Sequence, residues 1–417
     1  MTHNQDSRLL FLLLPALAMS LGWALRGFIG GGPLGAMIPG AMVALTLALL
    51  LELPAGVAAR AAAFSAIGVG FGGEMTYGQT VGFAGQSGTM WFGLLGLAVK
   101  GGVWGLLGGA VVALGFIRSR FTSARIVAAC AMMAAACYVG WRTVNQPKLI
   151  YFSNLADRPR EEVWFGFILA ALALLAVLRD GTVTRFSLYS LVGGFVGFGG
   201  GGLFIALHRI AMPDARWFMS WKMMEYTFGF FFGLALAAAA WRLRAQLRAE
   251  PEEENAPPPA PETLVTVIFT LLAAVFFAEN LRTRFDYLLV GAMLMPMLVA
   301  VRWLGWHIAI TMTYSCFVWD LAENVCERMA LAPMQAGWYF VAVASLVFLY
   351  LFDRRLRREP PPVRYAFLLL LWSSMTVATV KTVAQVAVSP HFPYEYPMFV
   401  AAMAGVLLML RKVKTAG

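Results

Sequence analysis

A single carboxylate stands in the middle of a glycine-rich apolar stretch, and this is where chemistry is first expected. Residues 64–85 read FSAIGVGFGGEMTYGQTVGFAG, with Glu74 near the centre. Glycine destabilises a helix by about 1 kcal/mol in water, whereas in a membrane small residues let helices approach closely. A carboxylate at such a depth usually faces a polar interior. We therefore predict that this stretch forms one wall of a buried polar site, with hydrogen-bonding groups from Thr76, Tyr77 and Gln79.

Lys100 is a second charged residue within an apolar run. It lies within the segment GLAVKGGVWGLLGG, which contains no acidic residue. A buried ammonium group needs a counter-ion from a neighbouring span, and Glu74, in the preceding span, is the first candidate. Two interpretations of this pair stay open, a functional site and a purely structural buried ion pair.

Two further pairs of charged residues are spaced three apart, so each pair lies on one helix face. Lys222 and Glu225 carry opposite charges and can neutralise each other. Asp320 and Glu323 are both acidic, and close carboxylates raise one another's pKa, which suits a proton or cation site. The alternative for the acidic pair is a solvated helix end.

The charged residues within apolar runs gather in the half of the bilayer that the topology below places outside. This asymmetry predicts a polar chamber that opens to the outer face. The substrate-binding residues expected there are Arg26, Glu74, Gln79, Lys100, Lys222, Glu225 and Lys381. The residues expected to bind a coupling proton or cation are Glu74, Asp320 and Glu323.

The sequence contains no pattern that indicates a metal ion, an organic cofactor or a defined catalytic residue. His208, His307 and His391 are scattered and have no carboxylate at ligand spacing. A phosphate-binding GxxxxGK[ST] loop and a GxSxG nucleophile motif are both absent. We therefore expect neither a metal site nor a cofactor.

The composition places the chain among integral membrane proteins. Of its 417 residues, 60% are hydrophobic and 13% are charged, whereas a soluble domain has about 25% charged residues. The formal net charge of +10 is carried by short clusters between apolar runs, a pattern typical of membrane topology. The partners expected are membrane lipids and a small polar solute or lipid-linked substrate, with no nucleic acid.

The fold predicted is all-α, a polytopic helical membrane protein with about 14 transmembrane helices. Each apolar run approaches the ~20 residues that cross a bilayer. The runs lie at about 9–27, 34–52, 57–79, 89–117, 126–144, 163–179, 186–208, 218–241, 263–281, 286–304, 306–325, 338–352, 364–387 and 397–411.

Loop charge orients these spans. If the basic C-terminal tail at 411–414 is cytoplasmic, the arginine clusters at 354–358, 242–248 and 118–125 fall on the same side, as the positive-inside rule requires. The N-terminus then also lies in the cytoplasm, and the poorly charged connection at 80–88 lies outside. The location expected is the cell membrane, of the bacterial inner-membrane type.

A proline- and acid-rich segment divides the chain. Residues 249–262 have a composition that does not form a packed element, so we predict a cytoplasmic linker between residues 1–248, with about eight spans, and residues 263–417, with about six. The sequence VGFGG begins at Val69 and again at Val196. This recurrence is consistent with a parallel duplication of the kind that transporters carry, or with coincidence.

Two functions fit these features. The first is a secondary transporter of a small polar or anionic solute, favoured by the many spans, the glycine-interrupted helices and the small soluble mass. The second is a membrane-embedded transferase that uses a lipid-linked sugar or acyl donor at the outer leaflet, with Glu74 or Asp320 as the general base. A non-catalytic scaffold or assembly factor is a third reading, which explains the buried charges least well.

Overall fold

A computed structural model describes residues 7–29, 31–156, 159–250, 295, 304–312, 361–388 and 393–413, and short stretches between 343 and 356. All regular elements in these residues are helical. The α-helices are α1 (Arg8–Ile29), α2 (Gly32–Leu50), α3 (Ala55–Phe71), α4 (Gly78–Ala84), α5 (Met90–Ile117), α6 (Ser123–Gly140), α7 (Trp164–Leu178), α8 (Gly181–Ala206), α9 (Ser220–Arg248), α12 (Leu304–Trp306), α15 (Val363–Val388) and α16 (Glu395–Leu410). The 3-10 and π turns are η1 (Gly72–Glu74), η2 (Arg118–Arg120), η3 (Trp141–Asn145), η4 (Leu207–Ala211) and η5 (His307–Met312).

Eight helical segments in the described residues are long and apolar enough to cross a membrane. The described residues are therefore all-helical, as predicted, and their long apolar helices are consistent with a multi-pass membrane protein. The span predicted at 263–281 lies outside the described residues, as do most of the spans at 286–304, 306–325 and 338–352 and nearly all of the linker at 249–262. The total of about 14 spans and the cytoplasmic position of both termini stay predictions.

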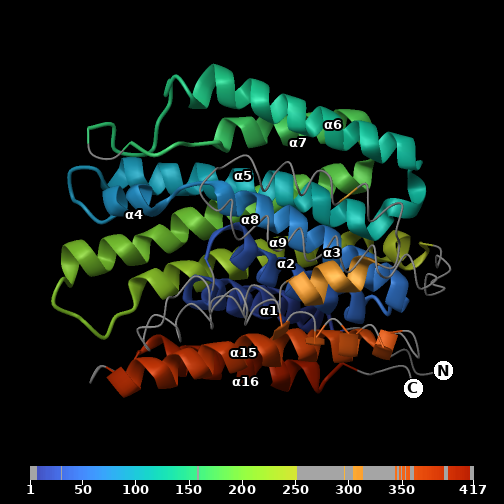
Figure 1. The fold of residues 1–417 in the computed structure, drawn as a ribbon. Helices are drawn as coiled ribbons and strands as arrows, with labels where there is room; N and C mark the ends of the chain where they lie inside the picture. Colours follow the sequence, from blue (N-terminus) through green and yellow to red (C-terminus); the bar gives the residue numbers. More distant parts are fainter. Residues whose placement is uncertain are drawn as a thin grey trace.

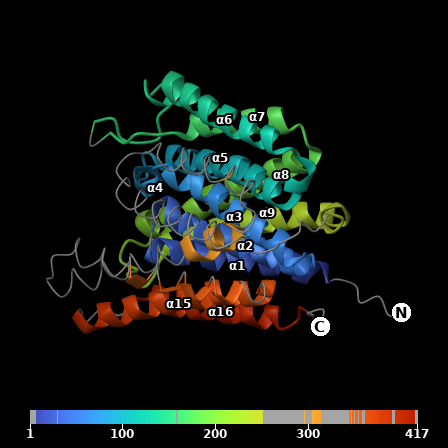
Figure 2. The ribbon, with the colours of Figure 1, turned by 45° about the vertical axis from the view of Figure 1, so that its right-hand side comes forward.

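The helices form an antiparallel bundle in layers (Figure 1). The hairpin of α6 and α7 lies at one edge, and α15 and α16 lie at the opposite edge against α1 and α2. Figure 2 shows the same order of layers after rotation, with α5, α8, α9 and α3 between the two edges. The centre of the bundle, which holds the most buried side chains, is therefore built from elements far apart in the sequence.

Local signals set several helix boundaries. Gly31 and Gly32 have positive φ values of 63° and 54° and make the turn from α1 into α2, a conformation that favours glycine. The Asp180 side chain accepts hydrogen bonds from the backbone N–H groups of Thr182 and Val183 and so caps α8. These signals fix where one span ends and the next begins.

A glycine seam holds α5 against α8. A Cβ atom added to Gly105 would lie 1.9 Å from the Ser190 carbonyl oxygen, and one added to Gly101 would lie 2.3 Å from the Gly194 carbonyl oxygen. The two backbones can approach this closely only because these positions have no side chain. The seam fixes the middle of the bundle around which the other helices pack.

The third predicted span does not continue to residue 79. Helix α3 ends at Phe71, η1 follows, and Met75 adopts an extended backbone conformation with ψ of 121° before α4 begins at Gly78. A Cβ atom at Gly72 would lie 2.1 Å from the indole nitrogen of Trp104. The glycines therefore allow the helix to be interrupted where the backbone packs closely against the Trp104 ring. We call residues 72–77 the α3–α4 break.

The repeated VGFGG sequence has two different conformations. The first copy, residues 69–73, ends α3 and enters the α3–α4 break, whereas the second, residues 196–200, lies within the continuous helix α8.

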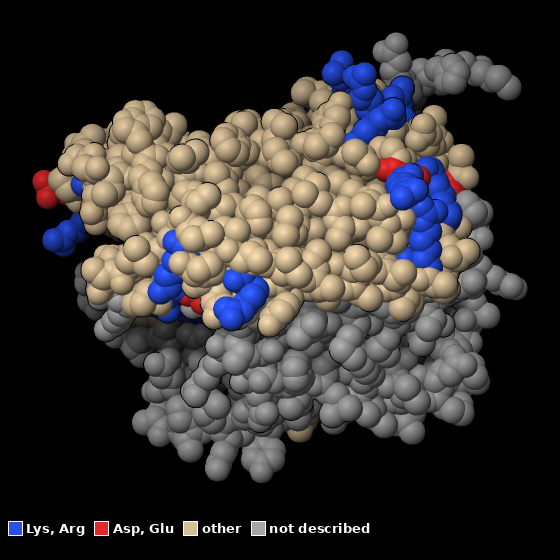
Figure 3. All heavy atoms as spheres, turned by 90° about the horizontal axis from the view of Figure 1, so that it is seen from above, with Lys and Arg blue, Asp and Glu red and all other residues tan. Residues whose placement is uncertain are grey.

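Basic side chains gather at the ends of the helices. Figure 3 shows Lys and Arg most densely at the right-hand end of the face it draws, with a broad tan area across the middle and fewer Lys and Arg toward the left. In Figure 1 the right-hand end is where α5 leads into α6. The turns at that end carry Arg118, Arg120, Arg125 and Arg179. The α3–α4 break and α4 belong to the opposite end, which the predicted topology places outside (Figure 1).

Candidate functional site

Arg26, near the end of α1, is enclosed by aromatic rings. The residue is only 2% exposed, and its guanidinium carbon lies 5.2, 5.6 and 5.9 Å from the ring centroids of Trp23, Trp104 and Tyr77. Cation–π contacts of this kind each contribute about 0.5–2 kcal/mol. They offset part of the free energy lost when the guanidinium leaves water.

The hydrogen-bonding capacity of Arg26 is mostly unused. Its Nη2 atom donates a long hydrogen bond of 3.4 Å to the Gly32 carbonyl oxygen. Its Nε and Nη1 atoms are buried and have no hydrogen-bond partner among the described residues. Buried donors without partners are costly, and charged ones most of all. An acceptor in the plane of these N–H groups would complete the hydrogen bonding of the guanidinium.

A buried ion pair lies beside Arg26. The Lys222 Nζ atom on α9 is 2.7 Å from the Glu225 Oε2 atom and 3.2 Å from the Ala24 carbonyl oxygen. The indole N–H of Trp221 donates to Glu225 Oε1 at 3.2 Å. A Cβ atom at Gly27 would lie 2.1 Å from Glu225 Oε1, so the carboxylate rests directly on the α1 backbone next to Arg26.

Tyr77, from the α3–α4 break, connects these charges. Its ring contacts Phe198 and Trp221, with centroid distances of 5.3 and 6.1 Å. The guanidinium of Arg26 lies 5.9 Å from the centroid of this ring, and Trp221, which the ring contacts, donates a hydrogen bond to Glu225. We call this group, Trp23, Arg26, Tyr77, Trp104, Trp221, Lys222 and Glu225, the Arg26 site.

Lys381 approaches the Arg26 site from α15. Its Nζ atom lies 5.5 Å from the Phe28 ring centroid, and Phe28 packs on Phe399, which contacts Lys222. Helix α15, from the second predicted bundle, thus brings a cation to the rim of a site built by the first.

Lys100, on α5, lies in a second polar cluster. Its Nζ atom is 2.7 Å from the Glu162 Oε1 atom, and both side chains are 1% exposed. The ammonium also donates to the Thr76 carbonyl oxygen at 2.6 Å and to the Thr80 hydroxyl at 2.8 Å. Three acceptors surround a group that has three N–H donors, so the charge is well satisfied.

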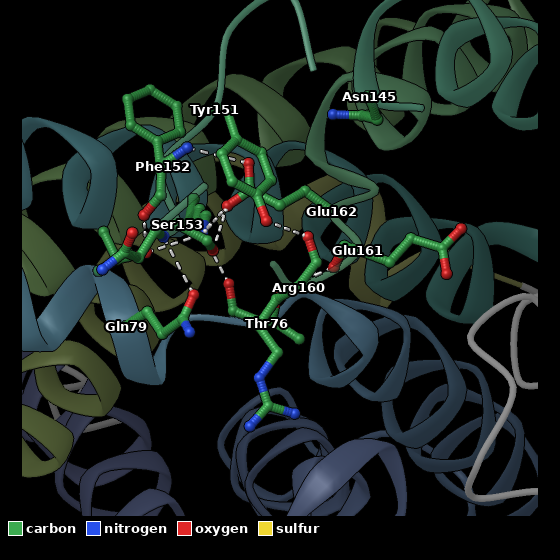
Figure 4. Close-up of polar contacts among 12 residues, drawn as sticks. Thr76, Gln79, Asn145, Tyr151, Phe152, Ser153, Arg160, Glu161 and Glu162 are labelled. Atoms are coloured by element: carbon green, nitrogen blue, oxygen red, sulfur yellow. Dashed lines mark hydrogen bonds and ion pairs between the residues drawn. The ribbon is translucent and has the colours of Figure 1, made fainter. Parts of the chain in front are cut away.

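Glu162 belongs to the long connection between η3 and α7. Its carboxylate accepts hydrogen bonds from the Ser153 hydroxyl at 2.8 Å and the Phe152 backbone N–H at 3.2 Å. Gln79 accepts a hydrogen bond from the Asn154 backbone N–H, and Figure 4 shows these side chains converging on the α3–α4 break. We call Lys100, Glu162 and these partners the Lys100 latch, because they fasten the connection to the bundle.

The two clusters meet at adjacent residues of the α3–α4 break. The Thr76 carbonyl oxygen accepts from Lys100, and its hydroxyl donates to the Glu161 carbonyl oxygen at 2.9 Å. Tyr77, the next residue, faces Arg26. The latch is therefore a scaffold that positions one wall of the Arg26 site.

The predicted site residues separate into these two groups. Arg26, Lys222 and Glu225 come together, with Lys381 at their rim, and the neutralisation predicted within the Lys222–Glu225 pair is confirmed. Lys100 and Gln79 belong to the latch, where Glu162 is a counter-ion of Lys100, whereas the sequence pointed to Glu74 as the first candidate. Glu74 is buried at the end of η1, and Asp320 and Glu323 lie outside the described residues.

Sequence reasoning missed Glu162 and the indoles of Trp23, Trp104 and Trp221. Glu162 follows another acidic residue in a polar connection, where a solvated position is the ordinary expectation. Each tryptophan lies within or at the start of an apolar run, without spacing that distinguishes a site from a core. Among the described residues, no three His, Cys, Asp or Glu side chains are grouped as a metal site would require.

Comparisons with protein-family models, with curated proteins and with solved structures find no significant match to this chain.

Proposed function

We propose that the protein is a secondary transporter of a small anionic solute, which binds at the Arg26 site. The observation that carries this proposal is the state of the Arg26 guanidinium, 2% exposed with two N–H-bearing nitrogens lacking partners among the described residues. A carboxylate, phosphate or similar anion supplies both the charge and the acceptor atoms that such a group lacks.

The position of the site supports transport. Tyr77 and Glu74 belong to an interrupted helix, and transporters commonly bind their solutes where spanning helices are broken. The broken segment is joined to α4 and not to a rigid continuation of α3. Movement of the α3–α4 break would expose Arg26 without unfolding a span.

The enclosure of Arg26 fits an occluded state. A guanidinium that is 2% exposed cannot exchange a solute with water until some wall moves. Alternating access requires such closed intermediates. The Lys100 latch, on the predicted outer side, is the contact that holds the Tyr77 wall closed.

The finer topology is part of the proposal. We infer about 14 spans with both termini in the cytoplasm, in a cell membrane of the bacterial inner-membrane type. The antiparallel order of the described helices and the arginine-rich turns at one end support this orientation.

Anion-dependent thermal stability followed by uptake tests the function. The test compares three detergent-purified proteins: wild type, Arg26→Gln and the control Arg216→Gln. Arg216 is an exposed arginine in the connection before α9. Each protein would be heated with the sodium salts of nitrate, benzoate, phosphate, sulfate and succinate. A bound ligand stabilises the folded state by mass action. At least one anion should raise the midpoint of thermal unfolding of wild type and Arg216→Gln but not of Arg26→Gln. Proteoliposomes that contain wild type or Arg216→Gln should take up this anion, and those that contain Arg26→Gln should not.

Two results would contradict the proposal. Stabilisation of all three proteins to the same extent would place any anion away from Arg26. A folded wild type that responds to none of these anions, but to a lipid-linked sugar or acyl donor, would favour the transferase.

A further inference from the structure

We infer that the Arg26 site is selective for solutes with a single negative charge, and that Glu225 sets this selectivity by cancelling the charge of Lys222. This inference rests on the proposed function, since it names the charge class of the solute. It assigns Glu225 a role in specificity rather than in direct contact with the solute.

The Glu225 carboxylate is held in an ion pair with the Lys222 ammonium group. The two charged groups are 2.7 Å apart and are 8% and 2% exposed, in the order Lys222 and Glu225. Trp221 donates to one oxygen of Glu225, and the close approach to Gly27 confines the carboxylate. The carboxylate thus neutralises its own lysine, and no ion pair or hydrogen bond joins it to Arg26 among the described contacts.

The remaining charge is that of Arg26. The two cations Arg26 and Lys222 and the one anion Glu225 leave a net charge of +1. Lys381 is half-buried and lies against Phe28 at the rim of the site. The sum concerns the three groups that share the buried centre. Uncompensated charge is costly in an apolar interior. A monoanion brings the three-residue centre to neutrality, whereas a dianion leaves it with a net charge of −1.

The aromatic rings around Arg26 also favour a solute with a single negative charge. Trp23, Trp104 and Tyr77 surround the guanidinium, so acceptors approach along the Nε and Nη1 directions. A planar carboxylate or nitrate matches such N–H groups well.

The test compares anions of different charge on charge-altered proteins. Wild type, Glu225→Gln, Lys222→Met and the double variant Lys222→Met/Glu225→Gln would be titrated at pH 7.5 and constant ionic strength with benzoate and nitrate, and with sulfate and succinate. The readout is the concentration that gives half of the maximal thermal stabilisation, with Arg216→Gln as the surface-charge control.

The inference predicts a reversal and a rescue. Wild type should respond to benzoate or nitrate at concentrations at least tenfold lower than to sulfate or succinate. Glu225→Gln, with a centre of +2, should prefer the divalent anions, and Lys222→Met, with a centre of 0, should lose most of its response. The double variant, again +1, should recover the preference of wild type.

Failure of this inference is distinguishable from failure of the proposed function. If wild type binds sulfate or succinate as tightly as benzoate, and Arg26→Gln abolishes this, the site binds anions but the monoanion assignment is wrong. An unchanged preference in a folded Glu225→Gln would also overturn it. If no anion acts through Arg26, the proposed function itself fails. If Glu225→Gln or Lys222→Met does not fold, the preference of wild type for monovalent or divalent anions still tests the monoanion assignment.

Discussion

Two buried cations of this bundle have opposite surroundings. Lys100 has a carboxylate and two further oxygen acceptors within 2.8 Å, whereas two nitrogens of Arg26 have no acceptor among the described residues. A satisfied buried ion pair is typical of a structural contact, and unsatisfied buried donors indicate a binding role. We therefore assign anchoring to Lys100 and propose solute binding for Arg26.

The anchoring role predicts a large stability loss when one partner of the latch is removed. Lys100→Met leaves the Glu162 carboxylate buried without the ammonium, and such changes cost about 3–5 kcal/mol. The apparent midpoint of thermal unfolding in detergent should fall clearly. The double variant Lys100→Met/Glu162→Gln, which buries no net charge at these two positions, should recover much of the loss. A single variant as stable as wild type would contradict a structural latch.

At the residue scale, the sequence identified the charges but not all of their partners. The pairing of Lys222 with Glu225 was predictable because residues three apart share a helix face. The pairing of Lys100 with Glu162 was not, because it joins residues 62 positions apart through a connection without regular structure. Fold-back contacts of this kind leave no periodic signal.

Glycine has two different uses among the elements of this chain. In α5 and α8 it permits close backbone contact along a regular seam, and in the α3–α4 break it permits a change of direction against Trp104 and Pro33. The sequence predicted both close packing and a site wall from glycine content. It did not place the end of α3 at Phe71, because an apolar composition continues through the break.

A pair of matched glycine substitutions tests the seam. Gly105→Ala places a methyl group 1.9 Å from the Ser190 carbonyl oxygen, whereas Gly200→Ala, on α8, meets nothing within 4 Å. Overpacking of this kind costs about 1–3 kcal/mol, while alanine in a free helical position is neutral or favourable. Midpoints of thermal unfolding should therefore fall for Gly105→Ala and hold for Gly200→Ala. Equal effects would show that α5 and α8 do not meet as described.

For the whole molecule, hydropathy and loop charge predict the spans and their orientation, because the bilayer imposes length and charge rules on every span. They do not give the lateral packing. Ser20 of α1 donates to the Tyr226 carbonyl oxygen of α9 at 2.7 Å, across 206 positions. Such neighbours depend on helix surfaces, which are apolar on most sides here.

Membrane orientation is testable with single cysteines. In a background without the four native cysteines, Ala156→Cys lies in the connection before α7 and Thr122→Cys in the turn between α5 and α6, and both positions are exposed. A membrane-impermeant maleimide should label residue 156 in intact cells and residue 122 only after permeabilisation. The reverse pattern would invert the topology, and labelling of both in intact cells would contradict the span between them.

The central claim is that a solute anion completes the hydrogen bonding of Arg26. Its most direct test is a structure of the nanodisc-embedded wild type saturated with whichever anion stabilises it most. The account predicts density for that anion in hydrogen-bonding contact with Arg26 Nε or Nη1, between the rings of Trp23, Tyr77 and Trp104. Density for the anion elsewhere, with the Arg26 N–H groups still lacking an acceptor, would contradict it.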